Sequence, residues 1–465
     1  MRNRVAAQVL IHIDERRRDA AMLLALGRLL TAAGIRVTFS TRRTTSTLLR
    51  GGRFDAALLP VISPYLPSVE LPRRRRCKLY LLPTEGAIFG ELPLMAKFGG
   101  GNQPERWDHY VQSTTRFFLW GDHSRRALQA TGRFREDQLV VIGAPRMDVH
   151  LVEPSPEERR LQDPRAIGAI TGVTLLNSYY RLTAFDVIDN ERRAHGRGFA
   201  PTRNIEDSYW VEGAHVRLWL ELLDECQRRG ERLTLRVHPR EDLQAYDYVR
   251  NRYHGIVRLD GQDVPFEAWL ERVGVVIGFS STAFFEAVAA NKPAISLTSL
   301  IGPRLHDHLD GFVGSHYPII DQLENPPSWE ALFEAIERIR QGLWDGYRDE
   351  TKAVLKDVCH YPRATSALAA IVQTLLQDLE GTSQRRGGVD RMIEGLADIR
   401  AQALDYGTFA IRRERVVSAW FPLELRRLER QLDLQIRRYL RAASQAQPSA
   451  SGGTMAIGEM EMSRR

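Results

Sequence analysis

Three consecutive hydroxyl side chains, Ser280, Ser281 and Thr282, follow an apolar run that ends at Gly278. The run Val275–Gly278 is rich in β-branched residues, as buried strands are, and a helical pattern begins directly after the hydroxyls. The first N–H groups of a helix lack partners and carry partial positive charge, so hydroxyls at such a turn favour a bound phosphate. An ordinary helix cap would account for one hydroxyl, but not for three.

A histidine at the end of another apolar run is the second candidate phosphate ligand. His238 follows the strand-like run 233–237 and precedes Pro239, which restricts it to an extended backbone and keeps the imidazole at the strand end. Arg236 and Arg240 add positive charge on either side. A purely structural histidine is the alternative. The hydroxyl turn further along the chain makes phosphate binding the favoured interpretation.

Two glutamates are candidates for contacts with hydroxyl groups. Glu286 lies one turn into the helix after the hydroxyl turn and could pair with a ribose hydroxyl; a solvated helix carboxylate would show the same pattern. Glu85 follows the apolar run 78–82 and precedes Gly86. A charge so close to a buried strand is either exposed or functional, so Glu85 is a candidate general base toward an acceptor hydroxyl. An exposed turn carboxylate is an equal alternative.

A third strand-to-turn segment carries both an arginine and an aspartate. In Gly143-Ala-Pro-Arg146-Met-Asp148 the aspartate could act as a nucleophile or an orienting group, with Arg146 holding it. The alternative is an Arg–Asp pair that fixes the hinge between two domains. Asp122, after Trp120-Gly121, shows a weaker form of the same pattern and could simply cap the next helix.

These side chains must be positioned by two sets of alternating strands and helices. In the first half we expect strands at 5–13, 35–39, 54–60, 78–82, 116–120 and 139–142, with helices at 19–33 and 124–131. In the second half we expect strands at 167–177, 233–237, 256–259 and 275–278, with helices at 211–229, 244–252 and 266–272. Such alternation predicts α/β domains with parallel sheets covered by helices.

The expected organisation is two Rossmann-like domains facing a cleft, followed by extra C-terminal helices. We place the amino-terminal, acceptor-side domain at 1–155 and the donor domain at 165–375. A helical extension at 376–443 and a disordered tail at 444–465 would follow, and the arginine-rich stretch 185–209 would be a loop or lid. Ligands of open parallel sheets bind beyond the carboxyl ends of the strands, where all the candidate residues fall.

Composition limits the partners of the chain. A formal charge of +7 spread over 465 residues is weak support for nucleic acid, and we expect no nucleic-acid partner. Three cysteines stand far apart without metal-ligand spacing, so we expect no metal, no cofactor and a reducing cytoplasmic location. No run approaches the ~20 apolar residues that span a bilayer, and the first apolar run is too short for a signal peptide.

Taken in order, these motifs resemble bacterial surface carbohydrate biosynthesis proteins of the GT-B glycosyltransferase class. The resemblance covers most of residues 8–300. Its marks are an acidic start with a Leu-rich first helix (13–25), Thr84-Glu85-Gly86, the Trp-Gly-acid segment 118–122, the Gly-x-Pro-Arg-x-Asp turn 143–148 and Leu175-Leu-Asn177. The His-Pro and Ser-Ser-Thr motifs recur in related transferases of Kdo (3-deoxy-D-manno-octulosonic acid) and sialic acid.

The resemblance implies a glycosyltransferase of capsule or other surface polysaccharide biosynthesis that needs no metal. The donor would be a nucleotide-sugar, foremost a CMP-sugar such as CMP-Kdo, with its phosphate held by the His-Pro and Ser-Ser-Thr motifs. Glu85 would be the acid–base group, and Asp148 the carried-over catalytic carboxylate. The acceptor would be a glycan or lipid-linked glycan, and the basic C-terminal helices could rest on the inner membrane surface, although plain packing is the favoured role for them.

Two alternatives remain open at this stage. The same order of motifs resembles the CDP-glycerol glycerophosphotransferases of teichoic acid synthesis. Those carry a histidine where this chain has Glu85, which favours sugar transfer over polyol-phosphate transfer. Thr84 also stands where the carbohydrate family usually has an acid, so the donor or acceptor could differ. The second alternative is a non-catalytic nucleotide-binding relative that kept the fold.

Overall fold

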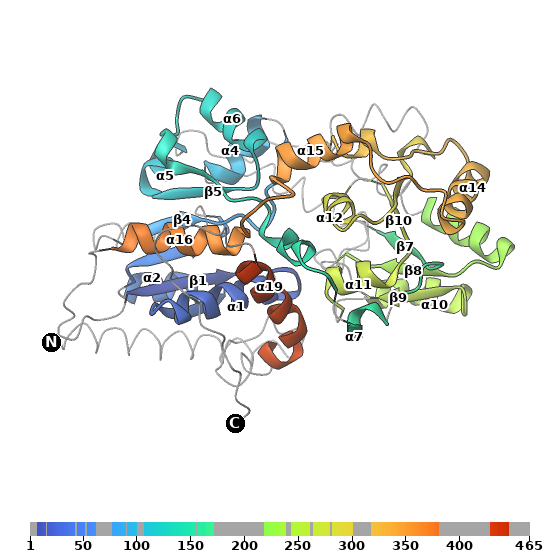
Figure 1. Cartoon of the computed structure of the whole chain (residues 1–465), viewed down its shortest axis with the longest axis horizontal. Coiled ribbons are helices and arrows are strands. Elements are labelled where there is room, and N and C mark those ends of the chain that lie inside the picture. Colours follow the sequence, from blue (N-terminus) through green and yellow to red (C-terminus); the bar gives the residue numbers. More distant parts are fainter. Residues whose placement is uncertain are drawn as a thin grey trace, which may run out of the picture. The chain divides into compact units, whose positions relative to one another are not determined.

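The computed structural model describes most of the chain, which forms two compact α/β units. The described residues are 7–14, 16–41, 44–51, 54–61, 77–89, 91–99, 107–154, 156–160, 162–171, 218–238, 243–260, 264–279, 281–300, 318–380 and 428–445. Unit 1 takes its residues from Met1–Gly86, Leu94–Glu153 and Cys359–Arg465, and unit 2 takes its residues from Ala87–Pro93 and Pro154–Val358. Each unit contains its own sheet, as the ribbon colours of Figure 1 show.

Unit 1 is built on a six-stranded parallel sheet in the order β2-β1-β3-β4-β5-β6. The strands are β1 (Gln8–Ile13), β2 (Arg36–Thr41), β3 (Ala56–Leu59), β4 (Lys78–Leu81), β5 (Arg116–Leu119) and β6 (Leu139–Val141). Strands buried on both faces carry nearly continuous apolar side chains, which is why these short runs were recognisable in the sequence. The connecting helices are α1 (Arg16–Ala32), α2 (Thr45–Gly51), α4 (Glu91–Phe98), α5 (Trp107–Ser113) and α6 (Asp122–Ala130).

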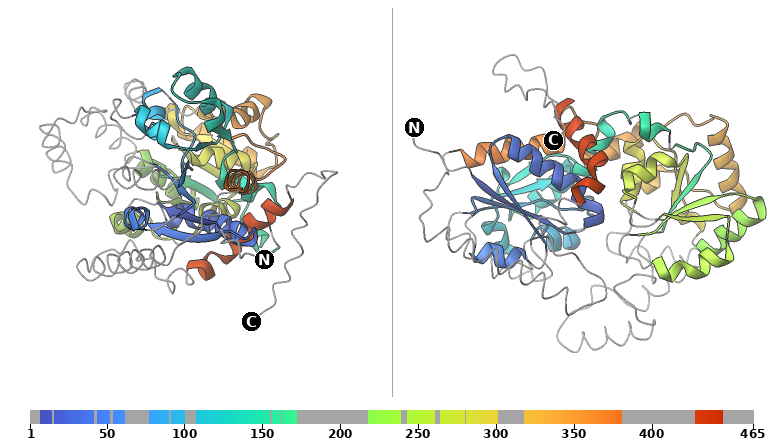
Figure 2. Two further views of the ribbon diagram at one scale, coloured as in Figure 1. Left: turned by 90° about the vertical axis from the view of Figure 1, so that its left-hand side faces the viewer. Right: turned by 90° about the horizontal axis from the view of Figure 1, so that it is seen from below.

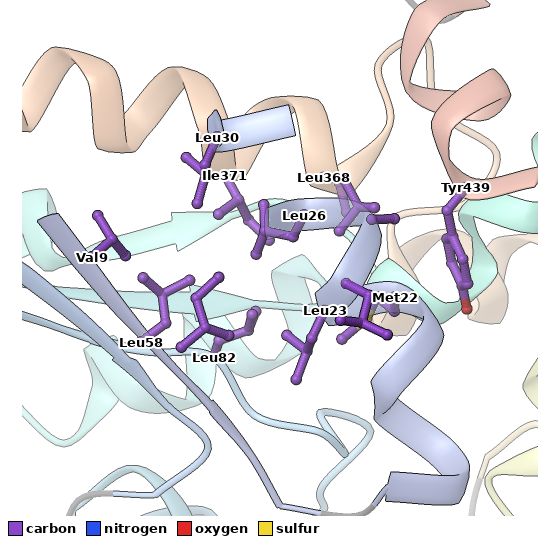
Figure 3. Packing of buried hydrophobic residues seen from close by; sticks show 14 of the residues in the cluster. Val9, Met22, Leu23, Leu26, Leu30, Leu58, Leu82, Leu368, Ile371 and Tyr439 are labelled. Carbon is purple, nitrogen blue, oxygen red and sulfur yellow. The ribbon is translucent and has the colours of Figure 1, made fainter. Parts of the chain in front are cut away.

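The core of unit 1 joins the two ends of the chain. The apolar stripe of α1, with Leu23, Leu26 and Leu30, packs against strand residues such as Val9 and also against the two C-terminal helices (Figure 3). Those helices are α16 (Ala367–Leu379) and α19 (Asp433–Gln445), and α19 lies beside α1 (Figure 2). The first and last described helices therefore share one hydrophobic core.

Unit 2 is built on a five-stranded parallel sheet in the order β11-β10-β7-β8-β9. Its strands are β7 (Ile167–Ile170), β8 (Leu233–Arg236), β9 (Val257–Asp260), β10 (Val275–Gly278) and β11 (Ala294–Ser296). Its helices are α7 (Pro156–Arg159), a helix at 218–229, α10 (Asp247–Arg252), α11 (Phe266–Arg272), α12 (Ala283–Ala289), α14 (Trp329–Arg340) and α15 (Asp349–Cys359). Most predicted strands thus appear within two or three residues of their expected bounds.

The C-terminal part of the chain divides differently from the predicted domains. The expected donor domain extended to 375, whereas the chain returns to unit 1 at Cys359, so α16 belongs to unit 1. The predicted lid at 185–209, most of the predicted helical extension and nearly all of the predicted tail lie outside the described residues. Among the residues that the structure describes, no helix is long and apolar enough to cross a membrane.

Candidate functional site

The hydroxyl turn of unit 2 lies at the point of the sheet where the strand order reverses. From β7 the chain runs outward to β8 and β9, and then crosses to β10 on the other side of β7. In doubly wound sheets, the carboxyl ends of the two strands at such a reversal flank the usual ligand crevice. Ser281 and Thr282 follow β10 at this edge, and the backbone before them passes so close to β7 that a Cβ on Gly278 would lie 3.2 Å from the Ile170 carbonyl oxygen.

One hydroxyl of the turn makes a local hydrogen bond, and another makes no capping bond. Ser281 Oγ accepts a hydrogen bond from the Ala283 amide, two residues further along the chain, at 3.2 Å. Thr282 is the residue at the N-cap position of α12, yet its side chain makes no capping bond. Both side chains are half-buried, whereas Ser280 lies outside the described residues. The Ser281 O–H can still donate, because its oxygen acts only as an acceptor in the bond from Ala283.

Thr171, which we did not single out in the sequence, links the end of β7 to the end of β8, the strand that precedes His238. Thr171 follows β7, is 4% exposed, and its Oγ1 accepts from the His238 amide at 3.1 Å. Its hydroxyl donates in turn to the Arg236 carbonyl oxygen at 3.4 Å. This bonding fixes the half-buried His238 at the end of β8, on the side of β7 opposite to the hydroxyl turn. The signal for Thr171 was its position directly after the buried run Ile167–Ile170.

The other two predicted donor residues are more deeply buried than a ligand contact would suggest. Arg236 is 6% exposed, and its Nη1 donates to the Val264 carbonyl oxygen at 2.5 Å. Glu286 is 5% exposed and lies on α12 among buried apolar residues. The structure therefore places Arg236, His238, Ser281, Thr282 and Glu286 near the carboxyl edge of one sheet, and it makes the histidine and the hydroxyls the more accessible of the five.

Glu85 of unit 1 is an accessible carboxylate in an ion pair. Its side chain is 44% exposed, and its Oε1 lies 2.5 Å from Nη1 of Arg18, on α1. Arg18 Nη2 also donates to Thr84 Oγ1 at 2.9 Å, while Arg18 Nε contacts Asp19 at 3.1 Å. Arg18 was visible in the sequence only as part of the charged run after β1. The fold brings it across the sheet edge to the end of β4, where it orients Glu85.

Asp148 occupies a different environment from Glu85, although both follow a strand and a turn. It is 0% exposed, accepts from the amides of Ala367 and Leu368 at 3.0 Å each, and pairs with Arg363. Burial raises the pKa of the Asp148 carboxyl, while Arg363 and the two amides oppose that rise. Asp148 thus caps α16, which is a structural use of a carboxylate.

Two details of the sequence interpretation are corrected by the side chains of this region. Arg146, expected to hold Asp148, lies over the Trp120 ring at 5.2 Å, and Arg363, far along the chain, takes its place. Asp122, considered as a cap, lies inside the first turn of α6 after the N-cap Gly121, and it pairs with Arg125 at 2.7 Å. In both cases the charged side chains after the strand have structural partners.

Comparison with known proteins identifies the fold. No protein-family model matches the chain, and no curated protein matches it by sequence. The wall teichoic acid polymerase TagF is similar in structure, with a TM-score of 0.51 at 11% identity over 81% of this chain and 90% of that chain. A TagF variant in a structure with CDPG gives a TM-score of 0.50 at 12% identity, over 81% and 90% of the two chains.

A UDP-GlcNAc 2-epimerase of Methanocaldococcus jannaschii, in complex with UDP-GlcNAc and UDP, gives a lower TM-score of 0.45 at 10% identity, over 80% of this chain and 99% of that chain. The likeness to TagF, together with the two parallel sheets, shows that the chain has an α/β fold of the GT-B class with two Rossmann-like units. The predicted fold class is confirmed in this respect.

Proposed function

We propose that this protein is a GT-B glycosyltransferase that moves a sugar from a nucleotide-activated donor to a cell-surface glycan precursor. The favoured donor is a CMP-sugar such as CMP-Kdo or a related acidic sugar, by resemblance of the motifs. The proposal rests on the carboxyl ends of the unit 2 strands, where the strand order reverses. Ser281 and Thr282 follow β10 there, and His238, whose amide is bonded to Thr171, follows β8. Such an edge suits the phosphate of a nucleotide.

The donor residues would act on the group that leaves. As the anomeric carbon exchanges its bond to phosphate for a bond to the acceptor oxygen, the electron pair of the broken bond passes to the nucleotide phosphate. His238, Ser280, Ser281 and Thr282 would donate hydrogen bonds to that phosphate, in place of a metal ion, and Arg236 would add positive charge. Glu286 would take its predicted place at a ribose hydroxyl of the nucleotide.

Glu85 is our candidate for the group that accepts the proton of the acceptor hydroxyl. Its carboxylate is exposed enough to reach a substrate, and Arg18 holds it in one orientation. Asp148 was the second predicted catalytic carboxylate. Its complete burial and its two amide partners favour a structural role instead, so we assign the chemistry in unit 1 to Glu85.

The nearest rival is transfer of a polyol phosphate from CDP-glycerol. The likeness to TagF favours it, because one of the similar structures was described with CDPG. The glutamate at position 85, where the glycerophosphotransferases carry histidine, favours sugar transfer. A non-catalytic nucleotide-binding protein with the same fold is the third reading, and the same assays separate all three.

The test is nucleotide release by the purified chain from CMP-sugars, UDP-sugars and CDP-glycerol, with calorimetry of CMP and CDP-glycerol binding alongside. We expect release from a CMP-sugar in the presence of a glycan acceptor, and a loss of about 100-fold in His238→Ala and Glu85→Gln. His254→Ala, which changes a histidine in the same unit away from the proposed donor edge, is the matched control and should keep wild-type rates.

The outcomes are distinct. Consumption of CDP-glycerol alone would select polyol-phosphate transfer, and binding without turnover of any donor would select the non-catalytic reading. Unchanged release in His238→Ala would refute the phosphate role of this histidine, and unchanged transfer in Glu85→Gln would refute the base assignment.

A further inference from the structure

The hydrogen-bonded ladder between β7 and β8 ends at a side chain. The ladder is regular up to the pair Ile170 and Arg236, and the Thr171 amide still donates to the Arg236 carbonyl oxygen at 3.2 Å. If the parallel ladder continued, the His238 amide would donate to the carbonyl oxygen of Thr171. It donates instead to the side-chain hydroxyl of Thr171, at 3.1 Å. A side chain thus replaces the backbone as acceptor just beyond the end of β8.

The Thr171 hydroxyl contacts the backbone on both sides of Val237. Its oxygen accepts from the His238 amide, and its proton is donated to the Arg236 carbonyl oxygen at 3.4 Å. On the other side of β8, the Val237 amide donates to the carbonyl oxygen of Asp260, the last residue of β9, at 3.3 Å. The backbone that leads to His238 is therefore held by both neighbouring strands of the sheet.

Burial makes these bonds decisive for the position of the histidine. Thr171 is 4% exposed and His238 is half-buried, so water has little access to the hydroxyl between them. A buried donor without an acceptor is costly, so without this hydroxyl the His238 amide would have to move to another acceptor. The carbonyl oxygen of Thr171 would be the regular choice, because it continues the ladder. The imidazole would then move with its backbone.

We propose that Thr171 is a positioning residue for the donor phosphate, and that it acts through His238. A hydrogen bond weakens steeply as its angle departs from linearity, so the imidazole must be held in one place to bind a phosphate well. The hydroxyl of Thr171 fixes that place through the backbone of the histidine. The inference rests on the proposed function, since it names a further residue on which the same phosphate site depends.

The binding of two nucleotides and their nucleosides tests the role of Thr171. The probes are CMP with cytidine and UDP with uridine, measured by calorimetry, or by saturation-transfer NMR where binding is weak. We expect the wild-type chain to bind at least one nucleotide more tightly than its nucleoside. Thr171→Val keeps the shape of the side chain and removes the hydroxyl, so it should weaken that nucleotide about tenfold and leave the nucleoside unchanged. Thr171→Ser keeps the hydroxyl and should bind much as the wild type does.

A double-mutant cycle separates positioning from a general structural role. If Thr171 acts through the imidazole, Thr171→Val should weaken binding no further in a His238→Ala background. Thr351→Val is the matched control, because Thr351 of unit 2 is 1% exposed and its hydroxyl donates to the Gln322 carbonyl oxygen at 3.5 Å. This control should bind as the wild type does. Thr171→Ala, which also lacks the hydroxyl, repeats the test should the valine variant fail to fold.

The outcomes separate this inference from the proposed function. Unchanged nucleotide binding in Thr171→Val, an equal loss for nucleotide and nucleoside, or a loss that adds to that of His238→Ala would overturn the inference and leave the phosphate site standing. A wild-type chain that binds neither nucleotide more tightly than its nucleoside would refute the phosphate role of His238, and the role of Thr171 with it.

Discussion

At the scale of single residues, the same local pattern serves two different purposes. Glu85 and Asp148 both follow an apolar strand and a turn, and the sequence offers a catalytic interpretation for both, as a general base and as a nucleophile or orienting group. The structure leaves the first 44% exposed beside Arg18 and buries the second completely beside Arg363. Exposure, which local sequence does not determine, separates a carboxylate that can meet a substrate from one that holds a helix in place.

This difference predicts effects of different size for two isosteric substitutions. Asp148→Asn should lower the free energy of unfolding by about 3–5 kcal/mol, because it leaves the buried Arg363 without its anion. Glu85→Gln breaks an ion pair that is half exposed and should cost no more than about 1 kcal/mol. Urea unfolding followed by circular dichroism measures both values. An Asp148→Asn protein of wild-type stability that lacks transfer activity would instead restore a catalytic role for Asp148.

At the scale of elements, α16 ties the C-terminal part of the chain to the middle of the unit 1 sheet. Its Asp378 accepts from Tyr80 of β4 at 3.0 Å and from two nitrogens of Arg116 of β5, at 2.8 and 3.1 Å. At the other end of the helix, Ser366 and Asp148 cap the first turn. Both ends of α16 are thus held by polar contacts, while its apolar face lies in the core.

The Asp378 contacts should make the stability of unit 1 depend on pH. Burial acts to raise the pKa of Asp378, but the hydrogen bonds from Arg116 and Tyr80 outweigh it, and the pKa is lowered in the folded state. A lowered pKa means that the stabilisation is complete above the unfolded value of about 3.9 and is lost as pH falls through the folded value. Asp378→Asn should therefore cost about 1.5–3 kcal/mol at pH 7 and progressively less below pH ~4.

Urea unfolding at a series of pH values between 7 and 2.5 checks this expectation. Asp349→Asn, which changes a carboxylate that is 97% exposed, is the control and should differ little from the wild type at every pH. A cost of Asp378→Asn that stays constant down to pH 2.5 would contradict the assigned ionisation.

At the scale of the whole molecule, each unit has a hydrophobic core of its own among the residues that the structure describes. The unit 1 core draws on residues from β1 to α19, whereas the unit 2 core is built from residues between β7 and α14. The unit 2 segment is thus inserted into unit 1, whose last helices follow it in the sequence. Unit 1 cannot complete its core before α19 has been synthesised.

Separate cores predict that a cavity in one unit acts locally. Ile277, 0% exposed in β10, belongs to the unit 2 core, and Ile277→Ala should destabilise that core by about 2–5 kcal/mol. Hydrogen exchange read by mass spectrometry should show loss of protection in peptides of β7, β8 and β10, with those of β1 and α1 unchanged. Ile371→Ala, at a 0% exposed position in the unit 1 core, should give the converse pattern. A uniform loss across both units in either variant would show one cooperative unit.

The sequence by itself determined what depends on neighbours along the chain. The runs of apolar residues in the sequence located β1, β4, β8 and β10, because parallel strands buried on both faces carry nearly continuous apolar side chains. The alternation of strands and helices then predicted the α/β class, and strand ends indicated where polar side chains gather.

Tertiary structure decided what depends on residues that are distant in sequence. It paired Asp148 with Arg363 rather than Arg146, and it bonded the Thr171 hydroxyl to the His238 amide. It also placed α16 in unit 1. Burial of an ionisable group and the identity of its partner depend on which strands become neighbours in the sheet. No local pattern specifies that order, and so the chemical roles of these side chains became distinguishable only in the folded chain.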